Sequence, residues 1–501
     1  MRDKISHWLN GNDPLKIPST LQSKLSEELY ESKFVNAVSI IVHRLSNIPW
    51  YTQKEILEEV DLTKDELIKV NKYIRGNSLL QESITKLGVG RKYWNTMSTF
   101  ANRTKDVIDY KYDFPLRIAV FPGISCMFYC GFCGRNQKAR YPGSLLKDGN
   151  KRFKDILNSI PETSAMSISG GLEPLTNPQL DDLISHAKSL GIRVPLITNG
   201  YSLTPNYLKK HPGMWDLDSL RISLYGIDEE SYDFITRKPG SYELVKTNTI
   251  NFLKQRNEIN PNLKFGFNYI IIPETMDHML PLIDLIEDIN SQVDNGPGID
   301  FLTLREDFGS VTEGSVADDE NRIYRLENFI SKDDRKVLVD TFKTFKEEQG
   351  KRCPELHVDY GYALVSISEG IVGKPLMKVD GTEMRNSGYP QLSVAVDLNG
   401  DIFLYREAGF LDRPGNDKFI LGRISEDKSF EDVIKEFVES EYSVDTVKHD
   451  NRFMDSFDHI LTTLVNQAEE DSKIGIPFEL GPVLDRCKEK DIKLGNNWYK
   501  S

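Results

Sequence analysis

The N-terminal part of the chain carries apolar residues at the spacing of an amphipathic helix. Within residues 21–45 the apolar positions recur every three or four residues. Residues 62–74 repeat this pattern and open with Thr63, a residue type that caps helices. Pro115 then marks a change of period. The pattern predicts a helical N-terminal region over residues 1–112.

Beyond Pro115, short apolar runs rich in β-forming residues alternate with amphipathic helical patterns. This alternation, with nearly continuous apolar strands, is typical of a parallel sheet covered by helices. Six strand–helix units fall short of the eight in a closed barrel, so we expect an α/β fold with a partial (β/α)6 TIM-like barrel over residues 113–330. The six predicted strands are residues 116–121, 165–169, 193–198, 220–225, 265–272 and 299–304.

The last third of the chain has a mixed pattern. A long charged helix is expected at residues 333–349, and two alternating strands flank Asn399 and Gly400 within residues 392–410. Asn-Gly is a strong hairpin signal because both residues tolerate positive φ. We therefore expect residues 331–501 to form an α+β C-terminal region with a β-hairpin that covers the substrate.

Composition describes an ordinary globular protein of 501 residues, for which two or three domains are expected. The formal net charge of −13 argues against nucleic-acid binding, which draws on concentrated Lys and Arg. No apolar run approaches the roughly 20 residues that span a bilayer, and the N-terminus lacks the apolar core of a signal peptide. The sequence predicts a cytoplasmic protein without a nucleic-acid or membrane partner.

Three of the five cysteines fall within eight residues, at Cys126, Cys130 and Cys133. They follow the first predicted strand, at the end where barrel-like α/β enzymes carry their chemistry. Iron–sulfur clusters use closely spaced thiolates, and three ligands would leave one iron of a cubane with an open position. A zinc site completed by a distant His or Asp is the alternative, although no second CxxC or paired-His pattern accompanies the three thiols.

The C-x3-C-x2-C spacing after a first barrel strand, with Phe132 before the last cysteine, resembles the radical S-adenosylmethionine (SAM) superfamily. The resemblance implies a partial barrel of the radical SAM type and a 4Fe-4S cluster held by the three cysteines. It also implies that the open iron binds SAM, which is cleaved to a 5′-deoxyadenosyl radical, and that a flavodoxin or ferredoxin donates the electron. SAM contacts are expected at Phe132, Ser169, Gly170, Gly171, Glu173, Asn199, Ser223 and Arg305.

Each of these residues taken alone is also compatible with a turn, a cap or a satisfied strand polar group. Longer segments resemble one group within this superfamily, the radical SAM ammonia-lyases of deoxyaminosugar biosynthesis. These segments are SGGLEPLTNP (169–178), LREDF (304–308) and DLNGDIFLYREAGF (397–410). Those enzymes act on dTDP-4-amino-4,6-dideoxy-D-glucose. The resemblance implies hydrogen abstraction from C3′ and loss of ammonia from C4′, giving dTDP-3-dehydro-4,6-dideoxy-D-glucose. A radical SAM dehydrogenase of a sugar or aminocyclitol alcohol stays open as the alternative.

The same resemblance suggests residues for the reaction. A carboxylate must handle the 3′-hydroxyl proton or the ammonium, and cations must hold the diphosphate of a nucleotide-sugar substrate. Glu306 and Asp307 end the sixth predicted strand and Glu407 follows the hairpin, so these are the predicted catalytic carboxylates. Without the resemblance, the charged triplet that contains Glu407 is as well explained as a solvated surface. The predicted substrate contacts are Tyr360, Tyr362, Tyr405 and Arg406.

Overall fold

The fold is given by a computed structural model. Contacts group the chain into two units: Met1–Asp109, Leu376–Val379 and Ile460–Arg486 form the first unit, and Tyr110–Pro375, Asp380–His459 and Cys487–Ser501 form the second unit. The predicted domain boundaries at residues 112 and 330 stay predictions, because contacts do not tell which segments fold independently. The structure describes residues 32–47, 52–85, 100, 103–133, 139–306, 332–361, 364, 389–411, 413, 415–440, 453, 456–477, 480–481 and 495.

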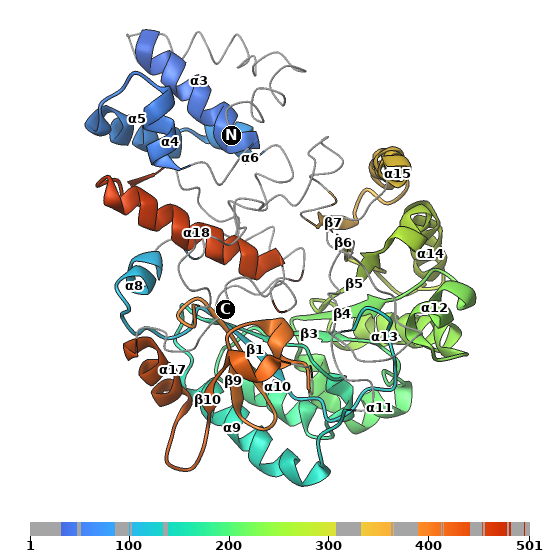
Figure 1. Cartoon of the computed structure of the whole chain (residues 1–501). Helices are drawn as coiled ribbons and strands as arrows, with labels where there is room; N and C mark the ends of the chain where they lie inside the picture. The colour runs from blue at the N-terminus through green and yellow to red at the C-terminus, as the bar shows by residue number, and fades with distance from the viewer. Residues whose placement is uncertain are drawn as a thin grey trace. The chain divides into compact units, whose positions relative to one another are not determined.

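Helices make up the described part of the first unit (Figure 1). Thr63 caps one of them as predicted: its side-chain oxygen accepts the Glu66 N–H at 3.3 Å, and the Glu66 carboxylate accepts the Thr63 N–H at 2.8 Å. This reciprocal pair satisfies backbone donors that a helix start leaves unpaired. Both predicted helices are confirmed where they are described, and residues 21–31 lie outside the described residues. The helices are α3 (Ser32–Asn47), α4 (Gln53–Glu59), α5 (Lys64–Gly76), α6 (Ser78–Thr85), α8 (Thr104–Ile108) and most of α18 (Ser456–Lys473).

One sheet of ten described strands organises the second unit, in the order β10-β9-β8-β1-β2-β3-β4-β5-β6-β7. All neighbours from β8 to β7 are parallel, and β9 and β10 continue the sheet antiparallel. Within the described residues the edge strands β10 and β7 do not pair, so the predicted open, partial barrel is confirmed. The six predicted strands are observed within two residues of their expected bounds: β1 (Arg117–Phe121), β2 (Ala165–Ile168), β3 (Pro195–Thr198), β4 (Ser219–Leu224), β5 (Lys264–Ile271) and β6 (Phe301–Glu306).

Two further strands lengthen the parallel sheet beyond the six predicted units. β7 (His357–Tyr360) pairs with β6, and β8 (Ser393–Asp397) pairs with β1 at the other end. β8 is also the first strand of the predicted hairpin. The hairpin therefore belongs to the barrel sheet itself.

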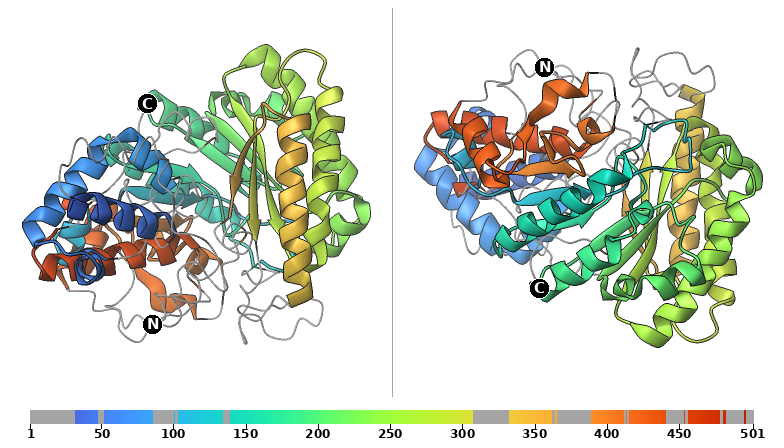
Figure 2. Two further views of the ribbon diagram at one scale, coloured as in Figure 1. Left: turned by 90° about the horizontal axis from the view of Figure 1, so that it is seen from above. Right: turned by 90° about the horizontal axis from the view of Figure 1, so that it is seen from below.

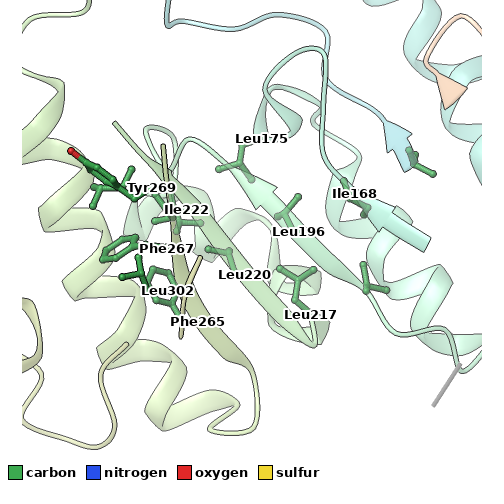
Figure 3. Packing of buried hydrophobic residues seen from close by; sticks show 14 of the residues in the cluster. Ile168, Leu175, Leu196, Leu217, Leu220, Ile222, Phe265, Phe267, Tyr269 and Leu302 are labelled. Atoms are coloured by element: carbon green, nitrogen blue, oxygen red, sulfur yellow. The ribbon is translucent and has the colours of Figure 1, made fainter. Parts of the chain in front are cut away.

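Helices cover one face of this sheet and enclose its apolar core. Side chains on alternate strand positions, such as Leu220 and Ile222 of β4 and Phe265 and Phe267 of β5, are fully buried in that core (Figure 3). In Figure 2, α14 and α15 lie side by side. No helix in the described residues is long and apolar enough to cross a membrane. The helices that follow the strands are α9 (Leu146–Ser159), α10 (Leu180–Ser189), α11 (Pro205–Lys210), α12 (Glu229–Thr236), α13 (Ser241–Ile259), α14 (Met279–Ser291), α15 (Lys332–Arg352) and α17 (Phe430–Glu439).

The predicted Asn-Gly hairpin joins β8 to β9 (Asp401–Phe403), and β10 (Ile420–Arg423) pairs with β9. Gly400 has a φ of +88°, and its N–H donates to the Asp397 carbonyl at 3.0 Å. Asn399 does not share the positive φ, because the connection has three residues and only its last position needs the left-handed region. β8 is buried along its whole length rather than alternating, since apolar clusters cover both of its faces.

Candidate active site

The three clustered cysteines lie on the loop that leaves the carboxyl end of β1. Cys130 is buried, with 6% of its surface exposed, whereas Cys126 and Cys133 are partly exposed. The Cys130 carbonyl accepts the Cys133 N–H at 3.0 Å, so these two cysteines share one tight turn. None of the three forms a disulfide within the described residues. The loop thus presents three thiols in a small volume.

Two neighbouring elements hold this loop in place. The last turn of α12 accepts backbone hydrogen bonds from Tyr129, at 2.9 Å, and from Gly131, at 3.1 Å. Carbonyls in the last turn of a helix lack intrahelical partners, so these bonds satisfy the helix end as well as the loop. On the other side, the Glu173 N–H donates to the Ser125 carbonyl at 2.9 Å. The positions of the cysteines are therefore set by α12 and by the segment after β2.

Aromatic rings fill the space beneath the cysteine loop. Phe128 is buried, and the rings of Tyr201, Tyr225 and Tyr232 meet its ring edge-on at centroid distances of 5.6, 5.8 and 6.1 Å. Edge-to-face contacts of this kind are favourable and depend on geometry. Phe132 lies 6.0 Å from Tyr225. These aromatic contacts thus hold the cysteine loop in place.

The chemistry of the donor set bears on which metal centre the loop suits. Thiolates are the usual ligands of iron–sulfur clusters, and each thiolate of a cubane binds a different iron. Three free thiols on one loop therefore fit a cluster.

The segment after β2 meets the segment after β9. Arg406 Nη2 donates to Ser169 Oγ at 3.3 Å. A Cβ added to Gly171 would lie 2.6 Å from the carbonyl oxygen of Gly409, and one added to Gly170 would lie 2.3 Å from the Leu172 carbonyl oxygen. The short helix η6 (Arg406–Gly409) therefore packs directly on SGGLEP, and Gly171 permits this close approach, whereas Gly170 permits a tight turn within the segment.

The carboxylate of Glu173 joins the ends of β2 and β3. The side chain is 4% exposed, and its oxygens accept the Asn199 N–H at 2.8 Å, the Leu175 N–H at 3.1 Å and the Thr198 hydroxyl. Burial raises the pKa of the Glu173 carboxyl, and the three donors act in the opposite direction. Glu173 thus positions the residues around it.

The amide of Asn199 faces the cysteine loop from the end of β3. Its Nδ2 lies 3.1 Å from Met127 Sδ and 3.8 Å from Cys126 Sγ, and its Oδ1 accepts the Tyr201 N–H at 3.0 Å. The side chain is buried. This geometry aims an N–H donor at a thiol, the kind of contact that tunes iron–sulfur clusters.

Strands β4 to β7 present polar residues on the interior face, the sheet face opposite to the helices. The register pairs Ser223 with Asn268, Asn268 with Thr303, and Thr303 with Asp359. Arg305 lies two residues beyond Thr303, so it shares this face at the carboxyl end of β6, and it is exposed. The predicted SAM contacts Ser223 and Arg305 therefore lie on one polar surface.

Two predicted substrate tyrosines lie in apolar packing instead. Tyr360 is next to Asp359 in β7 and points to the opposite face, where its ring lies 4.9 Å from that of Phe342 in α15. Tyr405 is 3% exposed and packs against Phe419 at 5.2 Å. Both rings pack against apolar neighbours, and a substrate contact at either position stays a prediction.

The predicted catalytic carboxylates are described only in part. Glu407 Oε2 lies 3.3 Å from Arg413 Nη1, which also donates to the Glu407 carbonyl at 3.1 Å. The Arg413 side chain is 4% exposed, so the carboxylate is held by a buried cation. Glu306 ends β6, but its side chain lies outside the described residues, as do Asp307 and Tyr362.

Comparison with known proteins bears on this arrangement. Residues 120–286 match the family model of the radical SAM superfamily. The chain is 36% identical over 437 residues to the dTDP-4-amino-4,6-dideoxy-D-glucose ammonia-lyase of Streptomyces venezuelae, an alignment that covers 86% of this chain and 87% of that protein. The chain belongs to the radical SAM superfamily.

Two other radical SAM proteins are also similar. The AdoMet-dependent heme synthase of Methanosarcina barkeri is 33% identical over 119 residues, which is 24% of this chain and 33% of that protein. Among solved structures, Streptococcus suis SuiB bound to S-adenosylmethionine has a TM-score of 0.45 and 16% identity, covering 81% of this chain and 84% of that chain.

As a radical SAM enzyme, the protein uses a 4Fe-4S cluster and SAM. Cys126, Cys130 and Cys133, three free thiols on one loop, are the residues that would hold the cluster. Of the predicted SAM contacts, Gly170, Gly171 and Glu173 make close contacts within the protein, and a SAM contact at these positions stays a prediction. The remaining predicted SAM contacts border the cysteine loop or the interior face, and a SAM contact at these positions also stays a prediction. They are Phe132, Ser169, Asn199, Ser223 and Arg305.

Sequence reasoning did not single out two residues that lie near this candidate site. Tyr225 lies beside the thiols, and burial, with a smaller effect from Cys130, raises the pKa of its hydroxyl well above 10, so it stays a neutral phenol. Its only sequence signal is its place at the end of the fourth predicted strand. Arg221 lies on the interior face of β4, two residues before Ser223. A charged residue within an apolar parallel strand is the signal that could have found it.

Proposed function

We propose that this radical SAM enzyme is an ammonia-lyase that converts dTDP-4-amino-4,6-dideoxy-D-glucose into dTDP-3-dehydro-4,6-dideoxy-D-glucose in deoxyaminosugar biosynthesis. The observation that carries the proposal is the 36% identity, over 86% of the chain, to the Streptomyces venezuelae protein of that name. The contact between YREAGF and SGGLEP supports it, because both segments belong to the narrower resemblance and Arg406 bonds to Ser169.

When bound, the cluster and SAM supply a 5′-deoxyadenosyl radical, which takes the hydrogen from C3′ of the sugar. The substrate radical then loses ammonia from C4′, and one electron and one proton complete the ketone. SAM cleavage consumes a second electron, so each turnover needs two. A flavodoxin or ferredoxin is the proposed donor of these electrons.

The chain is proposed to contribute carboxylates to this reaction. Glu306, Asp307 and Glu407 are proposed to take the 3′-hydroxyl proton or to guide the departing ammonium. Of these, Glu407 has a described environment: Arg413 fixes its carboxylate, and η6 rests on the segment after β2. Glu407 directly follows Arg406, whose side chain bonds to the predicted SAM contact Ser169, and this supports the proposal.

The test is an anaerobic assay of the reconstituted enzyme with SAM, a reductant and the dTDP-aminosugar. The proposal predicts that ammonia and 5′-deoxyadenosine appear in about equal amounts, because one abstraction leads to one elimination. A product that retains nitrogen and carries a new ketone would contradict it and support the dehydrogenase. Enzyme reconstituted with zinc instead of iron is the matched control and should release no ammonia.

A further inference from the structure

The side-chain amide of Asn199 is held in one orientation at the end of β3. Its Oδ1 accepts the Tyr201 N–H at 3.0 Å, and the backbone N–H of Asn199 donates to Glu173 Oε2 at 2.8 Å. Because the backbone N–H of Tyr201 can only donate, the oxygen end of the amide must face it. The NH2 group of Asn199 therefore points the other way, toward the cysteine loop.

A second side chain fixes the turn that carries Asn199. Asn248 of α13 is 2% exposed, and its Nδ2 donates to the carbonyls of Gly200, at 3.1 Å, and Tyr201, at 3.0 Å. Gly200 has a φ of +73°, a left-handed conformation that glycine adopts without steric cost. The Tyr201 ring in turn packs on Phe128 of the cysteine loop. The protein itself thus holds the end of β3 against the cysteine loop.

Both partners described for the Asn199 NH2 group are sulfur atoms. Nδ2 lies 3.1 Å from Met127 Sδ and 3.8 Å from Cys126 Sγ. A thioether and a neutral thiol are weak acceptors, and Asn199 is only 3% exposed, so water offers little replacement. A buried donor with weak partners costs free energy. The Cys126 sulfur becomes a charged and stronger acceptor when it is the thiolate ligand of a metal centre.

We infer that Asn199 donates a hydrogen bond to the Cys126 thiolate and thereby raises the reduction potential of the cluster. Reduction adds one negative charge, which the sulfur ligands share, so an N–H donor stabilises the reduced form more than the oxidised form. Asn199 is a positioning residue in this sense, because it acts through Cys126 and favours uptake of the electron. The role differs from the SAM contact predicted at Asn199, and it holds whichever sugar the enzyme takes.

The experiment is an anaerobic redox titration of the reconstituted enzyme without SAM or sugar, followed by the electron paramagnetic resonance signal of the reduced cluster. Asn199→Ala removes the donor and should lower the potential by about 59 mV, which is a tenfold change in the equilibrium of a one-electron couple. Asn199→Asp keeps an acceptor for the Tyr201 N–H but replaces the donor by an oxygen, so its potential should fall at least as far.

Asn262→Asp is the matched control for the added carboxylate. Asn262 is exposed and precedes β5, so it lies at the amino ends of the parallel strands, whereas the cysteine loop leaves the carboxyl end of β1. Its potential should equal that of the unchanged protein. All three variants should keep about four irons per chain and the SAM affinity of the unchanged protein.

Iron content and SAM affinity separate the inferred role from two others. An unchanged potential in Asn199→Ala overturns the inference, even where Asn199→Asp is shifted, because charge alone would then explain the shift. If Asn199→Ala holds no cluster, Asn199→Asp decides, and a potential that is not lowered in that variant overturns the inference. Loss of SAM affinity at an unchanged potential would make Asn199 a SAM contact, and loss of iron from both variants would give it a structural role. Either of these results also overturns the inference.

Discussion

At the scale of single residues, the neighbouring hydrogen-bond donors determine which side chain suits a buried polar position in this site. Glu173 illustrates this, because its two carboxylate oxygens receive two backbone N–H groups and the hydroxyl of Thr198. All three of these neighbours donate, so an acceptor-only carboxylate suits the position. The amide of glutamine would instead turn an NH2 group toward one of them.

We therefore predict that Glu173→Gln lowers the free energy of unfolding by about 1–3 kcal/mol, the cost of leaving a buried donor unsatisfied. Urea denaturation of the purified protein measures this change. Glu162→Gln is the control, since Glu162 is exposed in a turn. Equal free energies of unfolding for Glu173→Gln and the unchanged protein would contradict this prediction. They would mean that the Glu173 carboxyl is protonated and that the three donors do not require a carboxylate there.

Residue-level patterning also explains what the sequence could not predict about the packing of two tyrosines. Tyr360 directly follows Asp359 in β7, and neighbouring residues in a strand point to opposite faces. Nothing in the short run HVDY identified β7 as a strand, so the alternation could not be applied. The packing of Tyr405 was not predictable for a related reason: its neighbours Arg406 and Glu407 are charged, but Tyr405 itself belongs to an apolar cluster.

At the scale of elements, the β8–β9 hairpin is joined to the cysteine loop through Asp397. The Asp397 carboxyl accepts the Tyr141 hydroxyl and the Asp401 N–H, and the Tyr141 N–H donates to the Ile124 carbonyl at 2.8 Å. Burial raises the pKa of Asp397 from 3.8 to about 6; the Tyr141 hydrogen bond opposes this shift, and the charge of Asp401 adds to it. The folded protein therefore binds this proton more tightly than the unfolded chain does.

The contribution of Asp397 to the stability of the folded protein depends on pH. Because the folded-state pKa is the higher one, the contribution of Asp397 to stability is present near pH 4 and is lost as pH rises through 6, by about 3 kcal/mol in total. The asparagine side chain in Asp397→Asn does not titrate. The free energy of unfolding of this variant, relative to that of the unchanged protein, should therefore rise by about that amount between pH 4 and pH 7. Chemical denaturation at the two pH values measures the difference, and a constant difference would contradict the expectation.

At the scale of the whole molecule, hydrophobic periodicity predicted the individual strands and helices better than it predicted which of them pair or pack together. The six strands and the long helix at Lys332–Arg352 follow from local patterns that each segment carries by itself. The parallel pairing of β8 with β1 joins segments more than 270 residues apart, and no local pattern encodes it. The packing of η6 on SGGLEP depends on that pairing, so no local pattern in the sequence predicts it.

The proposed reaction creates a radical at C3′ of the sugar. The most direct measurement is the mass of 5′-deoxyadenosine formed from substrate that carries deuterium at C3′. The account predicts that this 5′-deoxyadenosine is heavier by one deuterium than the product from unlabelled substrate. Unlabelled 5′-deoxyadenosine, formed alongside released ammonia, would contradict abstraction at C3′.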